Sequence, residues 1–340
     1  MNSKVLLIYT GGTIGMLQDP KTGQLKPFDF KHLKSQIPEL NKFDVQLVTK
    51  AFKTPIDSSD MNPEIWIELV QLIEKNYLSY DGFVILHGTD TMSFTASALS
   101  FMLENLNKPI ILTGSQLPIS TIRTDGKENL ITAIEIAAAK RNGEPLVPEV
   151  CIFFESRLYR GNRTHKFNAE HFQAFQSANY PILVEAGVNL KYNHNAIQKG
   201  STKALKIHTQ LNPNIAILKM FPGISAEVVE AVMNAKNIKA VILETFGSGN
   251  ATTKEWFIKI LAKAIKNGLV ILNVTQCNAG QVEQNKYATG ATLQKIGIIG
   301  AADMTTEAAV AKLMYVLGLT KDIKKIKKLL TSSLRGEMTV

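Results

Sequence analysis

The chain has 340 residues, of which 45% are hydrophobic and 20% charged, and its formal net charge is +9 at pH 7. A single hydrophobic core stops growing at roughly 250–300 residues, so this length favours two cores over one and predicts a globular protein. No apolar stretch approaches the roughly 20 residues of a membrane-spanning helix, and no charged leader precedes the first apolar run, so we expect a cytoplasmic protein without a membrane partner.

Apolar runs of strand length alternate along the chain with amphipathic stretches of helix length. The strands expected, in chain order, lie at residues 4–9, 82–88, 109–114, 150–154, 215–221, 240–246 and 269–274. The clearest helical patterns lie at residues 61–76, 94–106 and 128–140. This alternation is typical of parallel sheets covered by helices, and it predicts an α/β fold.

The alternation breaks in a polar segment that is rich in Asn and Lys. We place a linker there, at residues 189–212, which separates a larger amino-terminal domain, 1–188, from a smaller α/β domain, 213–340. We expect the larger domain to hold a mostly parallel sheet flanked by helices. In "KDIKKIKKLL", residues 321–330, lysines alternate with apolar residues as in a helix that has a solvated lysine face. No aromatic residues interleave with these lysines, so we expect no nucleic-acid partner.

Hydroxyl-bearing residues follow the first three expected strands of the large domain. The sequences after these strands are "TGGTIG", "HGTDT" and "TGSQLP". Ligands of parallel sheets bind beyond the carboxyl ends of the strands, so these segments form the candidate site. The polar side chains that they bring to one edge of the sheet are Thr10, Thr13, Thr89, Asp90, Thr91, Thr113 and Ser115.

Neither a cofactor nor a metal is expected at this edge. The glycine-rich turn at residues 10–15 lacks the GxGxxG spacing of a dinucleotide site, and no phosphate-binding GxxxxGK[ST] occurs. His87 and Asp90 could together suggest a metal site, but no other His, Cys or Glu lies at the spacing of a metal ligand. We therefore interpret His87 as a strand-end histidine with its hydrogen bonds satisfied. Cys151 and Cys277 are far apart in the sequence, which favours reduced thiols over a disulfide or a zinc site.

A threonine hydroxyl is a weak nucleophile that needs a base, and the base needs an orienting partner. Lys166, in "YRGNRTHK", follows another expected strand, and Asp90 adjoins Thr89. A lysine in a partly desolvated pocket can act as a base once its pKa falls from ~10.4. The alternative for Lys166 is an ordinary surface lysine, and Asp125 reads as a cap of the helix that follows it.

A series of motifs carries a family resemblance. They are, in chain order, "TGGTIGM", "TPIDSSDM", "HGTDTM", "TGSQLP", "RTDGKENL", "YRGNRTHK", "GSGNA" and "YATG". In this order and spacing the chain resembles, essentially from end to end, the bacterial-type asparaginases and specifically the cytoplasmic type I L-asparaginases. The resemblance implies hydrolysis of L-asparagine to L-aspartate and ammonia without a metal or cofactor. It also implies a two-domain α/β fold and a homodimer or homotetramer.

The resemblance assigns roles to single residues. Thr13 matches the family's nucleophilic threonine, and the second catalytic cluster is matched by Thr89, Asp90 and Lys166. The loop that holds the α-carboxylate and α-amino groups of the substrate is matched by Asp57, Ser58 and Ser59, and Thr89 and Asp90 complete the substrate site. Asn250 matches a position that reaches the active site of a neighbouring subunit. From the residues alone, Asp57 and Ser58 are equally well explained as a helix N-cap ahead of residues 61–76.

The sequence departs from the family pattern at two places. Many members carry a tyrosine after the first threonine motif, but no tyrosine lies between Tyr9 and Tyr77 here. Ser59 stands where periplasmic relatives have a glutamine, which bears on the discrimination between asparagine and glutamine. We also expect residues 14–30, which have little apolar periodicity, to form a lid over the site.

Two other functions stay open at this point. One is an amidotransferase subunit that acts on misacylated tRNA and carries the same threonine motifs. That subunit normally has an additional amino-terminal domain, whereas this sequence starts directly at the first expected strand. The other is a non-catalytic amino-acid-binding sensor, although all four expected catalytic positions are present.

Overall fold

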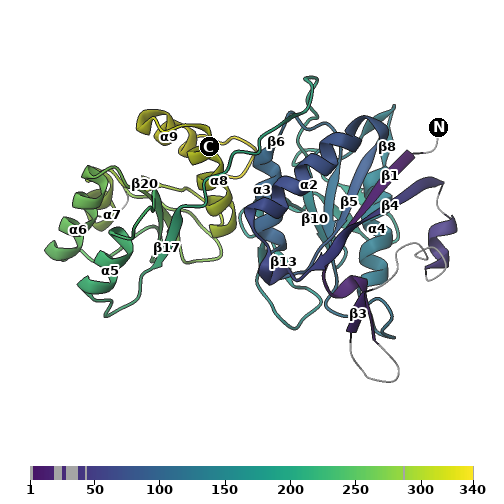
Figure 1. Ribbon diagram of the computed structural model, residues 1–340, viewed down its shortest axis with the longest axis horizontal. Coiled ribbons are helices and arrows are strands. Elements are labelled where there is room, and N and C mark those ends of the chain that lie inside the picture. Colours follow the sequence, from purple (N-terminus) through teal and green to yellow (C-terminus); the bar gives the residue numbers. More distant parts are fainter. Residues whose placement is uncertain (1–2, 19–24, 28–36, 43, 286–287, 340) are drawn as a thin grey trace. The chain divides into compact units, whose positions relative to one another are not determined.

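The computed structural model describes residues 3–18, 25–27, 37–42, 44–285 and 288–339. The chain divides into two compact units, Met1–Thr209 and Gln210–Val340. Each unit has its own sheet and its own helices (Figure 1). The predicted two-domain α/β fold is therefore confirmed. None of the helices in the described part of the chain is long and apolar enough to cross a membrane.

The first unit is built on an eight-stranded sheet. In order across the sheet, its strands are β15 (Leu190–Tyr192), β14 (Val184–Ala186), β11 (Arg157–Arg160), β10 (Val150–Phe154), β7 (Ile110–Thr113), β5 (Gly82–Leu86), β1 (Ser3–Gly11) and β4 (Val45–Ile56). The strands from β10 to β4 are parallel, and β11, β14 and β15 are antiparallel to their neighbours. The mostly parallel sheet predicted from the sequence is therefore confirmed.

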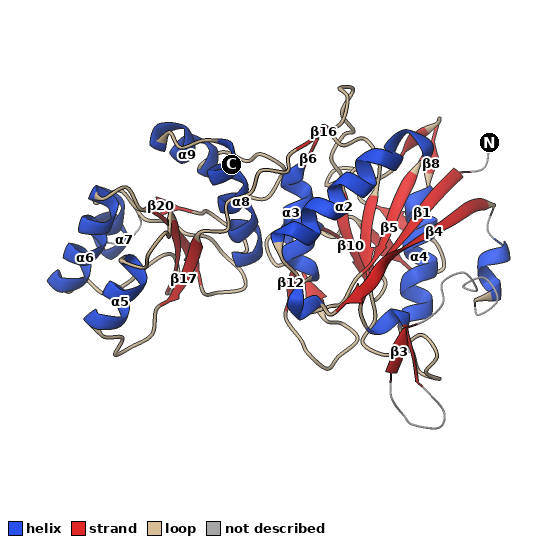
Figure 2. Ribbon diagram, viewed as in Figure 1, coloured by secondary structure: helices blue, strands red, loops and turns tan. Residues whose placement is uncertain are grey.

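Helices cover both faces of this sheet, which explains why its central strands are apolar along their whole length. The helices are α2 (Pro63–Asn76), α3 (Met92–Met102) and α4 (Gly126–Ala138). Figure 2 shows α2 and α3 side by side on one face and α4 on the other. Side chains alternate between the faces of a strand, so alternate residues of β1, β5, β7 and β10 pack on the side of the sheet that α4 covers.

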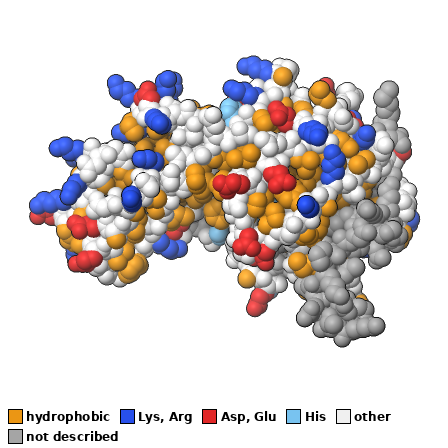
Figure 3. Space-filling model, viewed as in Figure 1, with side chains coloured by type: hydrophobic (Ala, Val, Ile, Leu, Met, Phe, Trp, Pro, Cys, Tyr) orange, Lys and Arg blue, Asp and Glu red, His pale blue; other side chains and the backbone are white. Residues whose placement is uncertain are grey.

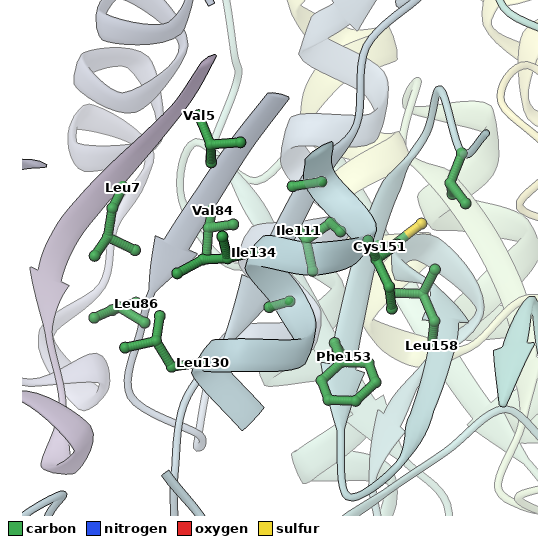
Figure 4. Packing of buried hydrophobic residues seen from close by; sticks show 14 of the residues in the cluster. Val5, Leu7, Val84, Leu86, Ile111, Leu130, Ile134, Cys151, Phe153 and Leu158 are labelled. Atoms are coloured by element: carbon green, nitrogen blue, oxygen red, sulfur yellow. The ribbon is translucent and has the colours of Figure 1, made fainter. Parts of the chain in front are cut away.

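The core between the sheet and α4 is continuous across the parallel strands (Figure 4). Leu130 and Ile134 of α4 pack there against side chains from four neighbouring strands. The residues of these four strands that are labelled there are Val5, Leu7, Val84, Leu86, Ile111, Cys151 and Phe153. This packing holds the parallel strands in position relative to one another, and thus determines where the loops after the strands begin.

Short strand pairs complete the first unit. They are β2 (Met16–Gln18) with β3 (Leu25–Pro27), β6 (Leu103–Glu104) with β16 (Lys206–Ile207), β8 (Lys140–Arg141) with β9 (Glu144–Pro145), and β12 (His165–Lys166) with β13 (Phe175–Gln176). The polar composition of residues 189–212 predicts a linker, but β15 and β16 lie within this segment and pair inside the first unit. The boundary between the two units falls after Thr209. Strands of two or three residues show no apolar periodicity, so the sequence pattern does not reveal that β15 and β16 belong to the first unit.

The second unit has a four-stranded parallel sheet with the order β17 (Ile215–Lys219), β18 (Ala240–Thr245), β19 (Val270–Thr275) and β20 (Ile299–Gly300). Its helices are α5 (Ala226–Met233), α6 (Glu255–Lys266), α7 (Ala288–Lys295), α8 (Thr306–Leu319) and α9 (Ile323–Leu330). The lysine-rich helix predicted near the end of the chain is α9. Ile326 and Leu330 are buried, whereas the four lysines of α9 are exposed. Figure 3 shows many lysine and arginine side chains standing out from the surface of this unit.

Candidate active site

The turn after β1 is glycine-rich because its backbone passes very close to two other loops. A Cβ atom on Gly11 would lie 2.0 Å from the carbonyl oxygen of Ile56, at the end of β4. A Cβ atom on Gly12 would lie 2.5 Å from the backbone nitrogen of Gly88, in the loop after β5. The sequence "TGGTIG" is thus explained by close backbone approach, which brings the Thr13 segment against the ends of β4 and β5.

Thr13 begins a short 3-10 helix, Thr13–Gly15, and is half-buried. The N–H of Gly15 donates to the carbonyl oxygen of Gly12 at 3.2 Å, and the buried hydroxyl of Tyr9 donates to the carbonyl oxygen of Gly15 at 3.1 Å. Burial raises the pKa of Tyr9 to about 12. Within the described residues, the hydroxyl of Thr13 has no hydrogen-bond partner, so the turn fixes its backbone and leaves its side chain available.

The lid predicted at residues 14–30 can be compared with the structure only in part. Residues 19–24 and 28–30 of this segment lie outside the described residues. The part that is described consists of the end of the 3-10 helix and the strand pair β2 and β3. The lid therefore stays a prediction.

The loop after β4 carries the residues expected to bind the substrate. The carboxylate of Asp57 accepts hydrogen bonds from the backbone nitrogen of Ser59 at 2.9 Å and from its hydroxyl at 2.5 Å. These two hydrogen bonds hold the pKa of Asp57 below its ordinary value. Ser58 is buried, and its carbonyl oxygen accepts a hydrogen bond from the hydroxyl of Thr91 at 2.6 Å. The loop is therefore tied to the segment that follows β5.

The N-cap alternative for these residues is correct in part. Asp57 caps a short 3-10 helix, Ser58–Asp60, through the backbone nitrogen of Ser59. The longer helix α2 is capped by Asn62, whose side chain accepts from the backbone nitrogen of Ile65. Ser58 caps neither helix.

Lys166 brings the central cluster together. Its Nζ donates to Oγ1 of Thr89 at 2.9 Å and to Oδ1 of Asp90 at 2.6 Å. The side chain of Lys166 is 16% exposed, and that of Asp90 is 66% exposed. Lys166 is therefore not an ordinary surface lysine: it is largely buried beside one hydroxyl and one carboxylate, the partners that a base at this site requires.

His87 is a buried side chain with its hydrogen bonds satisfied, as the sequence predicts. Its Nδ1 lies 2.6 Å from the carbonyl oxygen of Gly88, and its Nε2 lies 2.9 Å from Oγ1 of Thr95. The carbonyl accepts only, so Nδ1 carries the proton, and Nε2 accepts from Thr95, whose oxygen accepts from Trp66 Nε1 at 3.0 Å. Burial lowers the pKa of His87 to about 4, so the ring is neutral. Among the described residues, no group of three or more His, Cys, Asp or Glu side chains could hold a metal ion.

Asp125 does not cap α4 in the way the sequence indicates. It stands at the N-cap position, but its side chain makes no cap hydrogen bond. The carboxylate instead accepts from the backbone nitrogens of Gln116 and Leu117, with its shortest contact at 3.0 Å to Gln116. The sequence patterns did not identify Gln116 as a candidate site residue. Its position in "TGSQLP", directly after a buried strand, is the signal that could have identified it.

Asn250 belongs to the second unit. It follows β18, where its backbone N–H donates to the carbonyl oxygen of Phe246 at 2.8 Å and its carbonyl oxygen accepts from the N–H of Phe246 at 2.9 Å. The structure of the first unit thus brings together Lys166, Thr89 and Asp90, with the Thr13 turn and the Ser58 loop beside them. The expected role of Asn250 stays a prediction.

Comparison with known protein families gives one match for each of the two units. Residues 4–198 match the family model described as "Asparaginase, N-terminal". Residues 214–330 match the one described as "Glutaminase/Asparaginase C-terminal domain". These two matched segments correspond to the two compact units of the structure.

Individual proteins are similar over the full length of the chain. The sequence is 44% identical to "L-asparaginase 1" of Escherichia coli strain K12, over 98% of both chains. It is 41% identical to the "60 kDa lysophospholipase" of Mus musculus, over 99% of this chain and 63% of the mouse protein. The solved structure of L-asparaginase I from Vibrio cholerae O1 biovar eltor str. N16961 superimposes with a TM-score of 0.91 at 40% identity and covers 100% of both chains. The chain therefore belongs to the asparaginase family.

Proposed function

We propose that this protein is an L-asparaginase, which hydrolyses L-asparagine to L-aspartate and ammonia. The observation that carries the proposal is the contact of the largely buried Lys166 with Thr89 and Asp90, at the edge of the sheet that also presents Thr13. The full-length similarity to proteins named L-asparaginase supports it.

Thr13 acts as the nucleophile in the proposed reaction. Its Oγ bonds to the side-chain carbonyl carbon of asparagine, the C–N bond breaks, and the hydroxyl proton leaves with the amide nitrogen as ammonia. Water then attacks the resulting ester, which releases aspartate and restores the hydroxyl of Thr13. When water attacks the ester, its proton passes through Thr89 to Lys166, and the oxygen of Thr13 takes up a proton as the ester bond breaks; Asp90 orients the ammonium form of Lys166.

The substrate's α-substituents bind on the loop after β4. The hydroxyl and backbone N–H of Ser58 suit the α-carboxylate, and the carboxylates of Asp57 and Asp90 suit the α-ammonium. Ser59 supports this loop, because its hydroxyl and its backbone N–H both donate to Asp57. Asp57 is fixed by its two hydrogen bonds from Ser59, which keeps it ionised. Asn250 completes the site from the neighbouring subunit of a homodimer or homotetramer.

We infer a cytoplasmic enzyme that uses no metal or organic cofactor and binds neither nucleic acid nor membranes. An amidotransferase subunit and a non-catalytic sensor are less well supported. The match extends over 98% of a protein named L-asparaginase 1, and all four expected catalytic residues are present.

The first prediction is that the purified protein releases ammonia from L-asparagine, with L-glutamine a poorer substrate and EDTA without effect. A pocket shaped for the shorter amide places the longer one about 1 Å from its reactive position, which can cost roughly 100-fold in rate. Coupled detection of ammonia measures both rates. Lys166→Met should abolish most of the activity, whereas Lys191→Met, an exposed lysine on β15, should not. Equal turnover of both amides contradicts the selectivity, and near-normal activity of Lys166→Met contradicts the assigned base.

A further inference from the structure

The side chain of Gln116 joins segments of the first unit that meet at the edge of the sheet. Gln116 lies in the loop after β7. Its Nε2 donates hydrogen bonds to the carbonyl oxygens of Ala169, at 3.0 Å, and His171, at 3.2 Å, in the loop that follows Lys166. Its Oε1 lies 3.4 Å from Oγ1 of Thr89. No step of the proposed reaction yet uses this residue.

The contacts at one end of the amide decide which atom faces Thr89. The carbonyl oxygens of Ala169 and His171 can only accept, so the NH₂ group of Gln116 must face them and Oε1 must face Thr89. When Lys166 is protonated, Thr89 accepts from its Nζ and can direct its own proton toward Gln116. The contact of 3.4 Å is long for two oxygens, so the two contacts to backbone carbonyls account for most of the interaction.

The backbone of Gln116 is fixed as well. The half-buried carboxylate of Asp125 accepts from the backbone nitrogens of Gln116, at 3.0 Å, and Leu117, at 3.2 Å, and from Nδ2 of Asn129 at 3.3 Å. Hydrogen bonds to an ionised acceptor are stronger than neutral ones. Gln116 is therefore held at its backbone and at its side chain, and its amide cannot turn away without breaking several hydrogen bonds.

We propose that Gln116 is a positioning residue, which ties residues 167–171 to the sheet edge and so keeps Lys166 within hydrogen-bond distance of Thr89 and Asp90. Lys166 lies on a strand of two residues, β12, which pairs with β13. So short a strand gives the lysine little support of its own. The effect on rate rests on the proposed L-asparaginase activity, whereas the tie between the loops does not.

A kinetic experiment tests the effect on rate. Gln116→Met keeps the length of the side chain and removes its donors and its acceptor. We expect kcat for L-asparagine to fall about 10- to 100-fold, because Lys166 is displaced. KM should change less than about 3-fold, because most of the residues assigned to the α-substituents, Asp57 and Ser58, lie on the loop after β4, with which Gln116 makes no hydrogen bond in the described part of the chain. Gln71→Met, on the exposed side of α2, is the matched control and should leave both constants unchanged.

A second variant separates positioning from general stability. Gln116→Asn keeps the amide but is one methylene too short to reach both carbonyls, so it should show the same fall in kcat. The Tm of each variant should lie within a few degrees of the wild-type value, because a half-buried loop residue contributes little to global stability. A parallel loss of kcat and Tm, or a change in KM alone, overturns the positioning role.

Proteolysis tests the tie without any need for activity. Phe167 is 40% exposed and is a chymotrypsin site within the tied loop. Loss of the tie should raise the initial rate of cleavage after Phe167 at least about 5-fold in Gln116→Met, since local opening governs cleavage, and not in Gln71→Met. Equal cleavage in all three proteins overturns the tie, and faster cleavage with normal kcat overturns the positioning role. If the wild-type protein releases no ammonia, the proposed function fails, and the cleavage rates still decide whether the tie exists.

Discussion

His87 shows what a single residue contributes beside the reacting groups. It directly follows β5, and its protonated Nδ1 donates to the carbonyl oxygen of Gly88, the residue against which Gly12 packs. Its other nitrogen accepts from Thr95, which in turn accepts from Trp66. This buried chain fixes the backbone just before Thr89 without taking part in the proposed chemistry.

The pH dependence of stability follows from the burial of His87. Its pKa is about 4 in the folded protein and 6.5 when unperturbed, so between these values the unfolded chain binds the extra proton. The stabilisation is therefore complete above pH 6.5 and is lost as the pH falls toward 4. A shift of this size corresponds to roughly 3 kcal/mol in the free energy of unfolding.

Urea unfolding at pH 7 and pH 4 measures this effect. Carboxylates with lowered pKa values, such as Asp57, change stability in the same direction, so the wild-type protein must be compared with His87→Gln. We expect the wild-type protein to lose roughly 3 kcal/mol more than the variant over this range. Equal losses in the two proteins would show that His87 is not the titrating group.

At the scale of elements, the site depends on three loops that are held in contact by glycines. Gly12 has φ 89° and ψ 166°, a conformation that is essentially restricted to glycine. A Cβ atom on Gly88 would meet the hydroxyl of Ser58 at 2.5 Å. The turn after β1 thus packs backbone against backbone on Ile56 and Gly88, and Gly88 packs against the side chain of Ser58 in the loop after β4.

Gly12→Ala tests this packing. The new Cβ atom would lie 2.5 Å from the backbone nitrogen of Gly88, so the turn must move away and carry Thr13 with it. A displacement near 1 Å predicts a fall of roughly 100-fold in kcat. Gly143→Ala, between β8 and β9, is the matched control: it also has a positive φ, 85°, but no atom lies within 4 Å of its Cβ position. The control should lose a little stability and retain full kcat, and a similar loss in both variants would contradict the packing argument.

At the scale of the whole molecule, the proposed site takes Asn250 from a neighbouring subunit. An isolated chain should then be a poor enzyme. We expect the activity per chain to fall on dilution below the dissociation constant of the dimer, and sedimentation velocity to show monomers over the same concentration range. Asn250→Ala should reduce the activity of the assembled protein. A monomer with full activity in the ultracentrifuge would rule out a shared site.

The sequence by itself determined the fold class and the edge of the sheet at which the candidate site is expected. Its apolar runs are continuous, as in strands that are buried on both faces, so they predict a parallel sheet. Polar motifs that directly follow such strands must meet at one edge of the sheet. The residues expected at that edge include Lys166 and Thr89, which the structure indeed places in contact. The resemblance added roles that no periodicity contains.

Only the tertiary structure decided which polar groups at this edge are available. The hydroxyls of Thr10, Thr113 and Ser115 all donate to backbone carbonyl oxygens and are buried, so they fasten the strand ends. Asp125 holds a loop instead of capping its helix, and the side chain of Gln116 contacts Thr89 and the segment 169–171, both distant from it in the sequence. Hydrogen-bond partners depend on distances between loops, which are set by the packing of the whole sheet. A linear pattern shows which groups arrive at an edge, but not which of them find partners there.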